Sequence, residues 1–525
     1  MENRFNLIDE PWIPVADVGR VSLKDIFSNP RLRALGGNPV QKIALTKLLL
    51  AIAQAAATPQ DNDEWKAMGW LGMADKCLSY LSKWHDRFYL YGDQPFLQMP
   101  AIKNQIDKRT SGKVALAKTK SKILEAEESG KPKIVGTGDY PDIWAGNNTI
   151  LFQTLCPKQL NEQDLAVFLI SVMNLALGGK RVESNIVNLS GESLSPQYSA
   201  PAGPSLGGFV GNLHCFGFGE TILESIWLNL FSLEQIAERP VWNGIGNPPW
   251  EQMPVQEADA WSEAYAKTYM STLVALSRFV LFQDGGIYYM DGIHYPKVAE
   301  GWLEASLIIN FSDSEPKPIY VNLEKKPWRD LSSWLAYSSS NAIECIGLNW
   351  IKRRIRKESN ILNLWVGGIR VSSNSGDQSV KQNDDFLESS FQIDTDYLGD
   401  IATQQYQDEI AKLGTVISYT KKSVEKYFHQ AGDPKPTDVR KKTRAKEAAS
   451  TAEKIIWQLC ERHAQRLIDV CFADNSESTN RIALRRVFAS YAGQVFDQVC
   501  PNNSARQMDA WAQARPNFSK YLKDE

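Results

Sequence analysis

The chain has 525 residues and a mass of 59.0 kDa, too long for one ordinary hydrophobic core, so we expect at least two domains. Its formal net charge of −3 excludes a uniformly basic surface, so any nucleic-acid surface must be local. Seven scattered cysteines with no CxxC pair exclude a zinc ribbon and a disulfide framework.

The opening MENRFNLIDEPWIPV is not predicted to be a targeting signal. Asp9, Glu10 and Pro11 interrupt its apolar positions, whereas a secretory signal needs an unbroken apolar run. Proline fixes φ and favours an extended preceding residue, so the stretch predicts two short extended pieces around a proline turn. No run approaches about 18 apolar residues, so we expect no transmembrane helix, no membrane contact and a reducing, cytoplasmic location.

The next segments alternate between helical, extended and irregular patterns. Helical patterns occur at 40–57, 64–87, 163–177, 220–236 and around 329–338. Extended patterns occur at 88–98 and within 278–323, and irregular connections rich in Ser, Pro and Gly occur at 184–219 and 240–256. Gly178 and Gly179 are predicted to end the helix at 163–177, because glycine reaches the left-handed conformation without strain.

From about residue 396 helical periodicity dominates to the end of the chain. Four helices are predicted, at 400–430, 437–472, 479–499 and 504–523. Their short connections favour an antiparallel four-helix bundle. We therefore expect an α+β fold, with a large mixed α/β domain at 1–395 followed by a four-helix bundle at 396–525.

No motif assembles a catalytic or metal centre. The stretch CFGFGETILES (215–225) lacks the third glycine of a dinucleotide fingerprint, so we interpret it as a strand-to-helix turn. The five histidines are dispersed, and Asp384, Asp385 and Glu388 are better explained by a solvated loop edge than by a metal site. No nucleophile, base and orienting group come together, so we predict a protein that is not an enzyme and needs no metal or cofactor.

Local positive charge is more informative. Residues 103–122 carry seven basic residues and one acid, 350–357 (WIKRRIRK) carry five basics, and 421–446 carry nine basics and three acids. Solvated loops and helix faces explain such runs without a ligand, and phosphate binding is the functional alternative. The candidate phosphate contacts are Lys103, Lys108, Arg109, Lys113, Lys118, Lys120, Lys180, Arg181, Lys352, Arg353, Arg354, Arg356 and Arg370.

Three segments combine glycine with residues suited to a DNA groove: LALGGKR (175–181), DGIHYPK (291–297) and GGIRVSSNSGDQ (367–378). Glycine allows close backbone approach, and Lys, Asn and Gln reach minor-groove acceptors or wedge a base step. From spacing alone, an ordinary turn is the simpler interpretation of each segment.

An ordered set of short motifs then indicates a family. They are FNLIDEPWIPV (5–15), YGDQPFLQ (91–98), NNTILFQ (147–153), LALGG (175–179), PPWEQ (248–252), SRFVLF (277–282), YYMDG (288–292), PWRDL (327–331) and SYTKKSVEKYFHQ (418–430). With these motifs, the sequence resembles the large subunit of the type I-E CRISPR Cascade complex, the CasA family.

The resemblance implies a non-catalytic subunit that docks at the foot of a crRNA-guided complex. It implies that the protein tests double-stranded DNA for the protospacer-adjacent motif from the minor groove, helps open the duplex for R-loop formation and recruits a nuclease-helicase. The implied partners are the Cascade backbone, the small subunits, the subunit that binds the crRNA 5′ handle, the crRNA and the target duplex. Residues 5–15 would then be structural, with contact to a neighbouring subunit as the alternative.

The resemblance also assigns a docking loop and a glycine loop. The docking loop, near the crRNA 5′ handle, falls on Leu151, Phe152 and Gln153. The glycine loop that reads the motif falls on Gly178 and Gly179, with 207–208 (two further glycines) as the alternative.

A lysine finger and a wedge loop complete the implied site. The finger falls on Lys297, with His294 as the alternative. The wedge follows GGIR (367–370), but this chain has a serine at the aligned position and a longer loop, so Ser373, Asn374 and Gln378 are the candidates. Two rival functions stay open: a metal-dependent DNA phosphodiesterase and a purely structural scaffold subunit.

Overall fold

The computed structural model describes most of the chain. The described residues are 2–104, 135–136, 160–178, 189–190, 202–206, 211–239, 241–283, 286–335, 342–358, 361–374, 377–379, 385–431, 439–473 and 478–523. They form two compact units: unit 1 is Met1–Leu323, Ile343–Arg354 and Leu364–Ser389, and unit 2 is Glu324–Ala342, Ile355–Asn363 and Ser390–Glu525. The fold is α+β, as predicted, while the single division after residue 395 stays a prediction.

The strands are short and belong to several small sheets. They are β1 (Arg4–Asn6), β2 (Ile13–Val15), β3 (Gly19–Val21), β4 (Tyr89–Tyr91), β5 (Val135–Gly136), β6 (His214–Gly217), β7 (Arg278–Gln283), β8 (Gly286–Asp291), β9 (Ile309–Asn310), β10 (Lys317–Pro318), β11 (Ile343–Glu344), β12 (Ile361–Ile369), β13 (Ser372–Asn374), β14 (Asp377–Ser379) and β15 (Phe386–Asp394). The sheets have the orders β1-β4, β2-β3, β13-β14, β5-β8-β7, β10-β9-β11 and β15-β12-β6.

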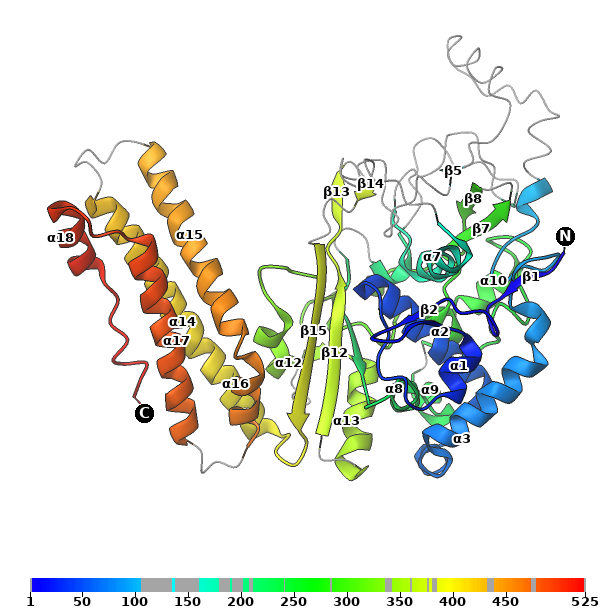
Figure 1. The fold of residues 1–525 in the computed structure, drawn as a ribbon. Coiled ribbons are helices and arrows are strands. Elements are labelled where there is room, and N and C mark those ends of the chain that lie inside the picture. The colour runs from blue at the N-terminus through cyan, green and yellow to red at the C-terminus, as the bar shows by residue number, and fades with distance from the viewer. Residues whose placement is uncertain are drawn as a thin grey trace, which may run out of the picture. The chain divides into compact units, whose positions relative to one another are not determined.

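The helices outside the C-terminal region mostly surround one core in unit 1 (Figure 1). They are α1 (Leu23–Ser28), α2 (Pro39–Ala57), α3 (Asn62–Lys83), α7 (Glu162–Leu175), α8 (Ile222–Asn229), α9 (Leu233–Ala237), α10 (Ala260–Tyr265), α11 (Tyr269–Leu273), α12 (Leu331–Leu335) and α13 (Ile346–Glu358). Strand β6 followed by α8 confirms the strand-to-helix turn predicted at 215–225.

Helix α2 is the central helix of this core. Asn38 caps it through a reciprocal pair of hydrogen bonds with Gln41, and Pro39 occupies its first turn. It packs against α3, α7, α8 and α11. By length and hydropathy α2 meets the criterion for a membrane-spanning helix, which corrects the sequence-based expectation that no segment would, but 72% of its apolar window is buried inside the protein. Such burial on nearly all sides is typical of a core helix.

The N-terminal stretch forms the predicted pair of extended pieces. Strand β1 pairs with β4, β2 pairs with β3, and a turn lies between β1 and β2. Leu7, Trp12 and Ile13 are completely buried, and the Trp12 indole donates to the carbonyl of Leu7 at 2.8 Å. The stretch is therefore part of the unit 1 core.

The C-terminal region is helical, as predicted. Its helices are α14 (Asp400–Ala431), α15 (Val439–Glu461), α16 (Ala464–Cys471), α17 (Ser478–Val499) and α18 (Ala505–Ala514). Helix α14 contacts each of the others, and α15 contacts α17. Between α14 and α17, the Arg485 guanidinium binds the Glu409 carboxylate, and both are almost fully buried.

Two helices of this region differ from the prediction, one by a break and one by an earlier end. The helix expected at 437–472 is broken at 462–463, where His463 leaves helical geometry and its ring bonds the Tyr491 hydroxyl at 2.8 Å. The helix expected at 504–523 ends at Ala514, because Pro516 forces Arg515 into an extended conformation.

Candidate nucleic-acid interface

The end of α7 leads into the predicted glycine loop. The helix ends at Leu175, earlier than the glycines that were predicted to end it, because Ala176 is already extended. Tertiary bonds set this end: the Asn174 amide donates to the carbonyl of Leu273 at 2.9 Å and accepts from the Ala275 N–H at 3.1 Å. Asn174, at the end of α7 and four residues before Gly178, is therefore held by the segment 273–275.

The segment 291–297, which carries the predicted lysine finger, docks on the same backbone. The Ile293 N–H donates to Leu276 at 3.0 Å, and the Tyr295 hydroxyl donates to Ala275 at 2.6 Å. A Cβ on Gly292 would stand 1.9 Å from the Leu276 carbonyl oxygen, so only glycine allows this approach. Two segments that are distant in sequence thus both form hydrogen bonds with residues 273–278.

The finger candidates themselves are exposed. Lys297 has an exposed side chain, while its backbone N–H donates to the Glu300 carboxylate at 3.1 Å and fixes the start of the turn at 298–300. The side chain of His294 is 53% exposed, and its Nε2 lies 3.9 Å from Asp291. Lys297 therefore presents an exposed cation on a backbone whose N–H is bonded to Glu300.

The three wedge candidates lie in one hairpin. Strands β13 and β14 pair in antiparallel fashion, with Ser373 opposite Gln378 and Asn374 opposite Asp377. The base of the hairpin is held by Arg370, whose Nε donates to the buried Asp385 carboxylate at 3.0 Å. The Arg370 charge is therefore paired, and its predicted phosphate contact remains a prediction.

Residues 202–206 and 211–213, here called the bridge, join the hairpin base to the end of α7 through hydrogen bonds and close backbone contacts. The Gly203 N–H donates to Ala176 at 2.7 Å, and the Asn212 amide donates to Pro204 at 3.3 Å. A Cβ on Gly368 would stand 2.6 Å from the Asn212 carbonyl oxygen, so β12 lies directly against this bridge. In Figure 1 α7, β7–β8 and β13–β14 lie in the upper part of unit 1.

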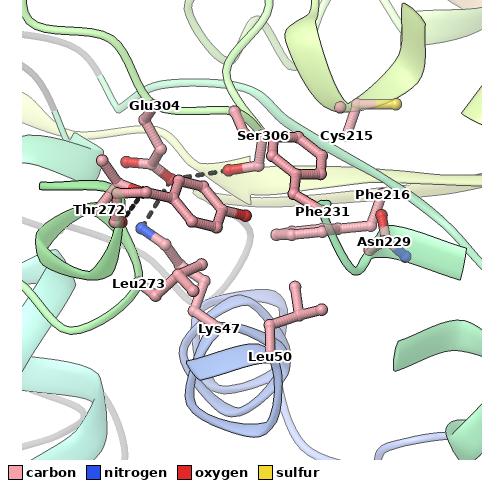
Figure 2. Close-up of a pocket in the computed structure, with 13 residues that line it drawn as sticks. Lys47, Leu50, Cys215, Phe216, Asn229, Phe231, Thr272, Leu273, Glu304 and Ser306 are labelled. Carbon is pink, nitrogen blue, oxygen red and sulfur yellow. Dashed lines mark hydrogen bonds and ion pairs between the residues drawn. The ribbon is translucent and has the colours of Figure 1, made fainter. Parts of the chain in front are cut away.

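A buried ionic network lies beneath the bridge. The Lys47 ammonium lies 2.6 Å from Glu304 and donates to Ser205 at 2.7 Å, as Figure 2 shows for the Lys47–Glu304 pair. His214 lies 3.0 Å from the Ser306 hydroxyl, which in turn donates to Glu304 at 2.7 Å. This network ties Ser205 of the bridge to α2, β6 and the segment 304–306.

Burial and the neighbouring charges together shift the pKa values of this network. Burial lowers the pKa of Lys47, and Glu304 opposes that effect. Burial would raise the pKa of the Glu304 carboxyl, but Lys47 and His214 outweigh it and hold that pKa below its usual range. The adjoining cavity measures about 20 Å³, room for roughly one water molecule, so it is not a substrate site.

Two predicted phosphate contacts are corrected by the structure. Lys352 and Arg354 on α13 are each only 3% exposed and cannot reach a DNA backbone. The Arg354 guanidinium donates to Leu230 at 2.5 Å and to Gln235 at 2.7 Å, and it stacks on Trp65. Burial lowers the pKa of Lys352 to about 8.

The other cations differ in what the structure shows. Arg353 is exposed and lies 4.7 Å from the Trp350 ring centre, and Lys103 is exposed, so both remain candidates. Arg356 belongs to α13, but its side chain is outside the described residues. Also outside them lie Lys108, Arg109, Lys113, Lys118, Lys120, Leu151, Phe152, Gln153, Gly179, Lys180, Arg181 and 207–208.

Within the described ranges, no three His, Cys, Asp or Glu side chains converge to hold a metal ion. What the geometry offers instead is an exposed cation, the helix end that leads into the glycine loop and a hairpin, all on one connected framework. Sequence reasoning found the three loops but missed the framework at 202–206, 211–213 and 273–278. The glycines at 203, 211 and 292, each in close backbone contact, were the signal that could have found it.

Comparison with known proteins identifies the family. The model of the family "CRISPR-associated protein Cse1" matches residues 6–495. The CRISPR-associated protein CasA/Cse1 of Thermus thermophilus is 24% identical over 346 residues, spanning 63% of this chain and 60% of that protein. The aligned stretch thus covers less than two thirds of this curated relative.

Solved structures share the fold over almost the whole chain. A Thermus thermophilus CasA structure superposes with a TM-score of 0.69 at 18% identity, covering 99% of both chains. Thermobifida fusca Cse1 gives 0.69 at 16% identity, covering 99% of this chain and 98% of that one. A chain of a CRISPR RNA-guided surveillance complex gives 0.65 at 15% identity, covering 99% of both chains. With a family match that spans most of its length, the chain belongs to the CRISPR-associated protein Cse1 family.

Proposed function

We propose that this protein is the non-catalytic large subunit of a crRNA-guided type I-E Cascade surveillance complex. In this role it reads the protospacer-adjacent motif of double-stranded DNA, helps open the duplex and recruits a nuclease-helicase, in the cytoplasm. The observation that carries the proposal is the docking of two loops, one ending at Gly178 and one carrying Lys297, on the single segment 273–278. A surveillance-complex chain with the same fold supports it.

The chemistry of these loops suits the minor groove. The groove presents N3 and O2 acceptors, and the guanine amino group is its main distinguishing feature. The exposed Lys297 ammonium donates to those acceptors, while a glycine backbone at Gly178 comes close to the groove and limits the space for an exocyclic amino group. Such reading tolerates several motifs, so the target sequence is specified by pairing with the guide RNA.

The hairpin provides the opening step. Inserting a polar element between base pairs costs a few kcal/mol of stacking, which new protein contacts offset. Ser373, Asn374 and Gln378 are the residues for this role, on a base held by the Arg370–Asp385 pair. Lys103 and Arg353 contact phosphates and make binding sensitive to salt.

The partners in this proposal are the Cascade backbone, small and 5′-handle-binding subunits, with docking through Leu151, Phe152 and Gln153. A change of Lys297 to alanine tests the finger in the assembled complex. Losing a charged hydrogen bond worth about 1.5–3 kcal/mol should lower motif-dependent affinity roughly tenfold or more. Lys24→Ala, an exposed lysine on α1, is the matched control. Equal motif discrimination in both variants would refute the finger.

Mg²⁺-dependent cleavage separates the proposal from a phosphodiesterase. The purified chain should leave plasmid and linear duplex intact in Mg²⁺ or Mn²⁺. Cleavage that co-purifies with the chain and responds to changes in its carboxylates would favour the rival function.

A further inference from the structure

Arg278, at the start of β7, is a buried arginine that the sequence did not single out. Its side chain is 1% exposed, so it touches no ligand directly. The guanidinium donates to the carbonyl of Ser277 at 2.8 Å and to the carbonyl of Leu177 at 2.9 Å. A buried charge is costly unless hydrogen bonds compensate it, so these two carbonyls have fixed positions relative to Arg278. Leu177 directly precedes Gly178.

The backbone next to Arg278 also contacts the segment 291–297, which carries the finger. Arg278 is the cross-strand partner of Asp291, the last residue of β8, so both side chains lie on one face of the strand pair. Asp291 is 4% exposed and is followed by Gly292, whose N–H donates to Ser277 at 3.3 Å. A Cβ on Gly292 would also stand 2.7 Å from the backbone nitrogen of Arg278. The Ser277 carbonyl therefore accepts from both the Arg278 guanidinium and the Gly292 N–H, and this links the end of α7 to the start of the segment that carries Lys297.

We propose that Arg278 is a positioning residue for motif reading: its guanidinium sets the spacing between the Gly178 backbone and the Lys297 finger. This inference rests on the proposed function of the two loops. A planar guanidinium directs several N–H groups in a fixed fork and bonds Leu177 and Ser277 together, whereas a lysine ammonium is a shorter-reaching point charge. The spacing decides whether backbone and finger fit the groove at the same time.

Arg278→Lys in the assembled complex is the test. The readout is the ratio of affinities for duplexes with the accepted motif and with a scrambled motif. We expect the ratio to fall roughly tenfold, as expected for a lost charged hydrogen bond, while affinity for the scrambled duplex stays unchanged. A merely structural role would weaken both affinities together through loss of folded complex.

Arg354→Lys is the matched control. Arg354 is also a buried arginine of unit 1 that binds backbone carbonyls, those of Leu228 and Leu230, and among the described residues it contacts neither 175–178 nor 291–297. We expect this variant to lose comparable thermal stability and to keep the affinity ratio. Asp291→Asn is a second, milder change, since it removes the charge of the cross-strand partner of Arg278; it should also lower the ratio and serves if Arg278→Lys does not assemble.

The outcomes separate this inference from the proposed function. A folded, assembled Arg278→Lys or Asp291→Asn variant with the wild-type ratio would overturn the positioning role and leave the motif-reading proposal intact. If the wild-type complex itself bound the accepted and the scrambled motif with equal affinity, the proposed function would fail. Hydrogen exchange of the isolated chain then tests the positioning role. Arg278→Lys should speed amide exchange at both 175–178 and 291–297, because the arginine links the two segments. Faster exchange at only one of them would contradict that link.

Discussion

Replacing Lys47 with methionine tests the buried network beneath the interface. Lys47 and Glu304 are each 1% exposed, and their charged groups lie 2.6 Å apart. Breaking one partner of such a pair costs about 3–5 kcal/mol, because it leaves a buried charge uncompensated. Hydroxyls of Ser205 and Ser306 still donate to Glu304 at 2.8 and 2.7 Å, so we expect the lower end, about 3 kcal/mol.

Urea unfolding followed by tryptophan fluorescence measures this loss at pH 7. The double variant Lys47→Met/Glu304→Gln should be more stable than the single variant, because the buried charge is then gone. Lys317→Met is the control, since Lys317 forms an exposed pair with Asp313 and its loss should change stability far less. A Lys47→Met variant that matches this control, or a double variant less stable than the single one, would refute the reasoning.

The same network predicts a pH dependence. The folded-state pKa of Glu304 is lowered, so its stabilising contribution is present above the unfolded-state pKa of about 4.3 and is lost as pH falls further. Without Lys47 that pKa rises, so the cost of Lys47→Met should shrink as pH approaches about 4. A cost that does not change between pH 7 and that pH would contradict a charged Glu304.

Three further predictions concern the loops and α13. Gly292→Ala should abolish motif discrimination in complexes that still assemble, because the new Cβ would stand 1.9 Å from the Leu276 carbonyl oxygen; discrimination by gel shift at the wild-type level contradicts this. Because the pKa of Lys352 is lowered to about 8, stability should rise with pH from about 8 to about 10.4, and Lys352→Met should remove that slope in denaturant titrations. Arg370→Gln should slow strand opening, measured by 2-aminopurine fluorescence, more than initial motif binding, because it loosens the base of the hairpin; equal effects on both would argue against a wedge.

The sequence predicted the elements whose cause is local. The apolar and proline positions of FNLIDEPWIPV correctly indicated β1 and β2, and helical periodicity found the C-terminal helices. The early end of α18 was also readable, because Pro516 follows it. These features depend on residues close together in the chain, so a pattern is enough to find them.

Features that depend on distant partners were not predictable. The sequence predicted Lys352 and Arg354 as surface cations, because nothing in WIKRRIRK indicates that Arg354 donates to the distant carbonyl of Leu230. Helix α7 ends at Leu175 because Asn174 bonds the backbone near Leu273, about a hundred residues further along the chain. The meeting of the glycine and finger loops follows from the same long-range bonds, so the three loops were recognisable singly but their common framework was not.

Motif-dependent DNA binding by the crRNA-loaded complex, with and without this chain, tests the central claim most directly. A gel-shift titration would use duplexes that differ only in the protospacer-adjacent motif, at one fixed salt concentration. We predict tight, motif-dependent binding only when the chain is present, and its loss in the Lys297→Ala complex. Equally tight binding without the chain would contradict the claim and leave a scaffold or recruiter in place of a motif reader.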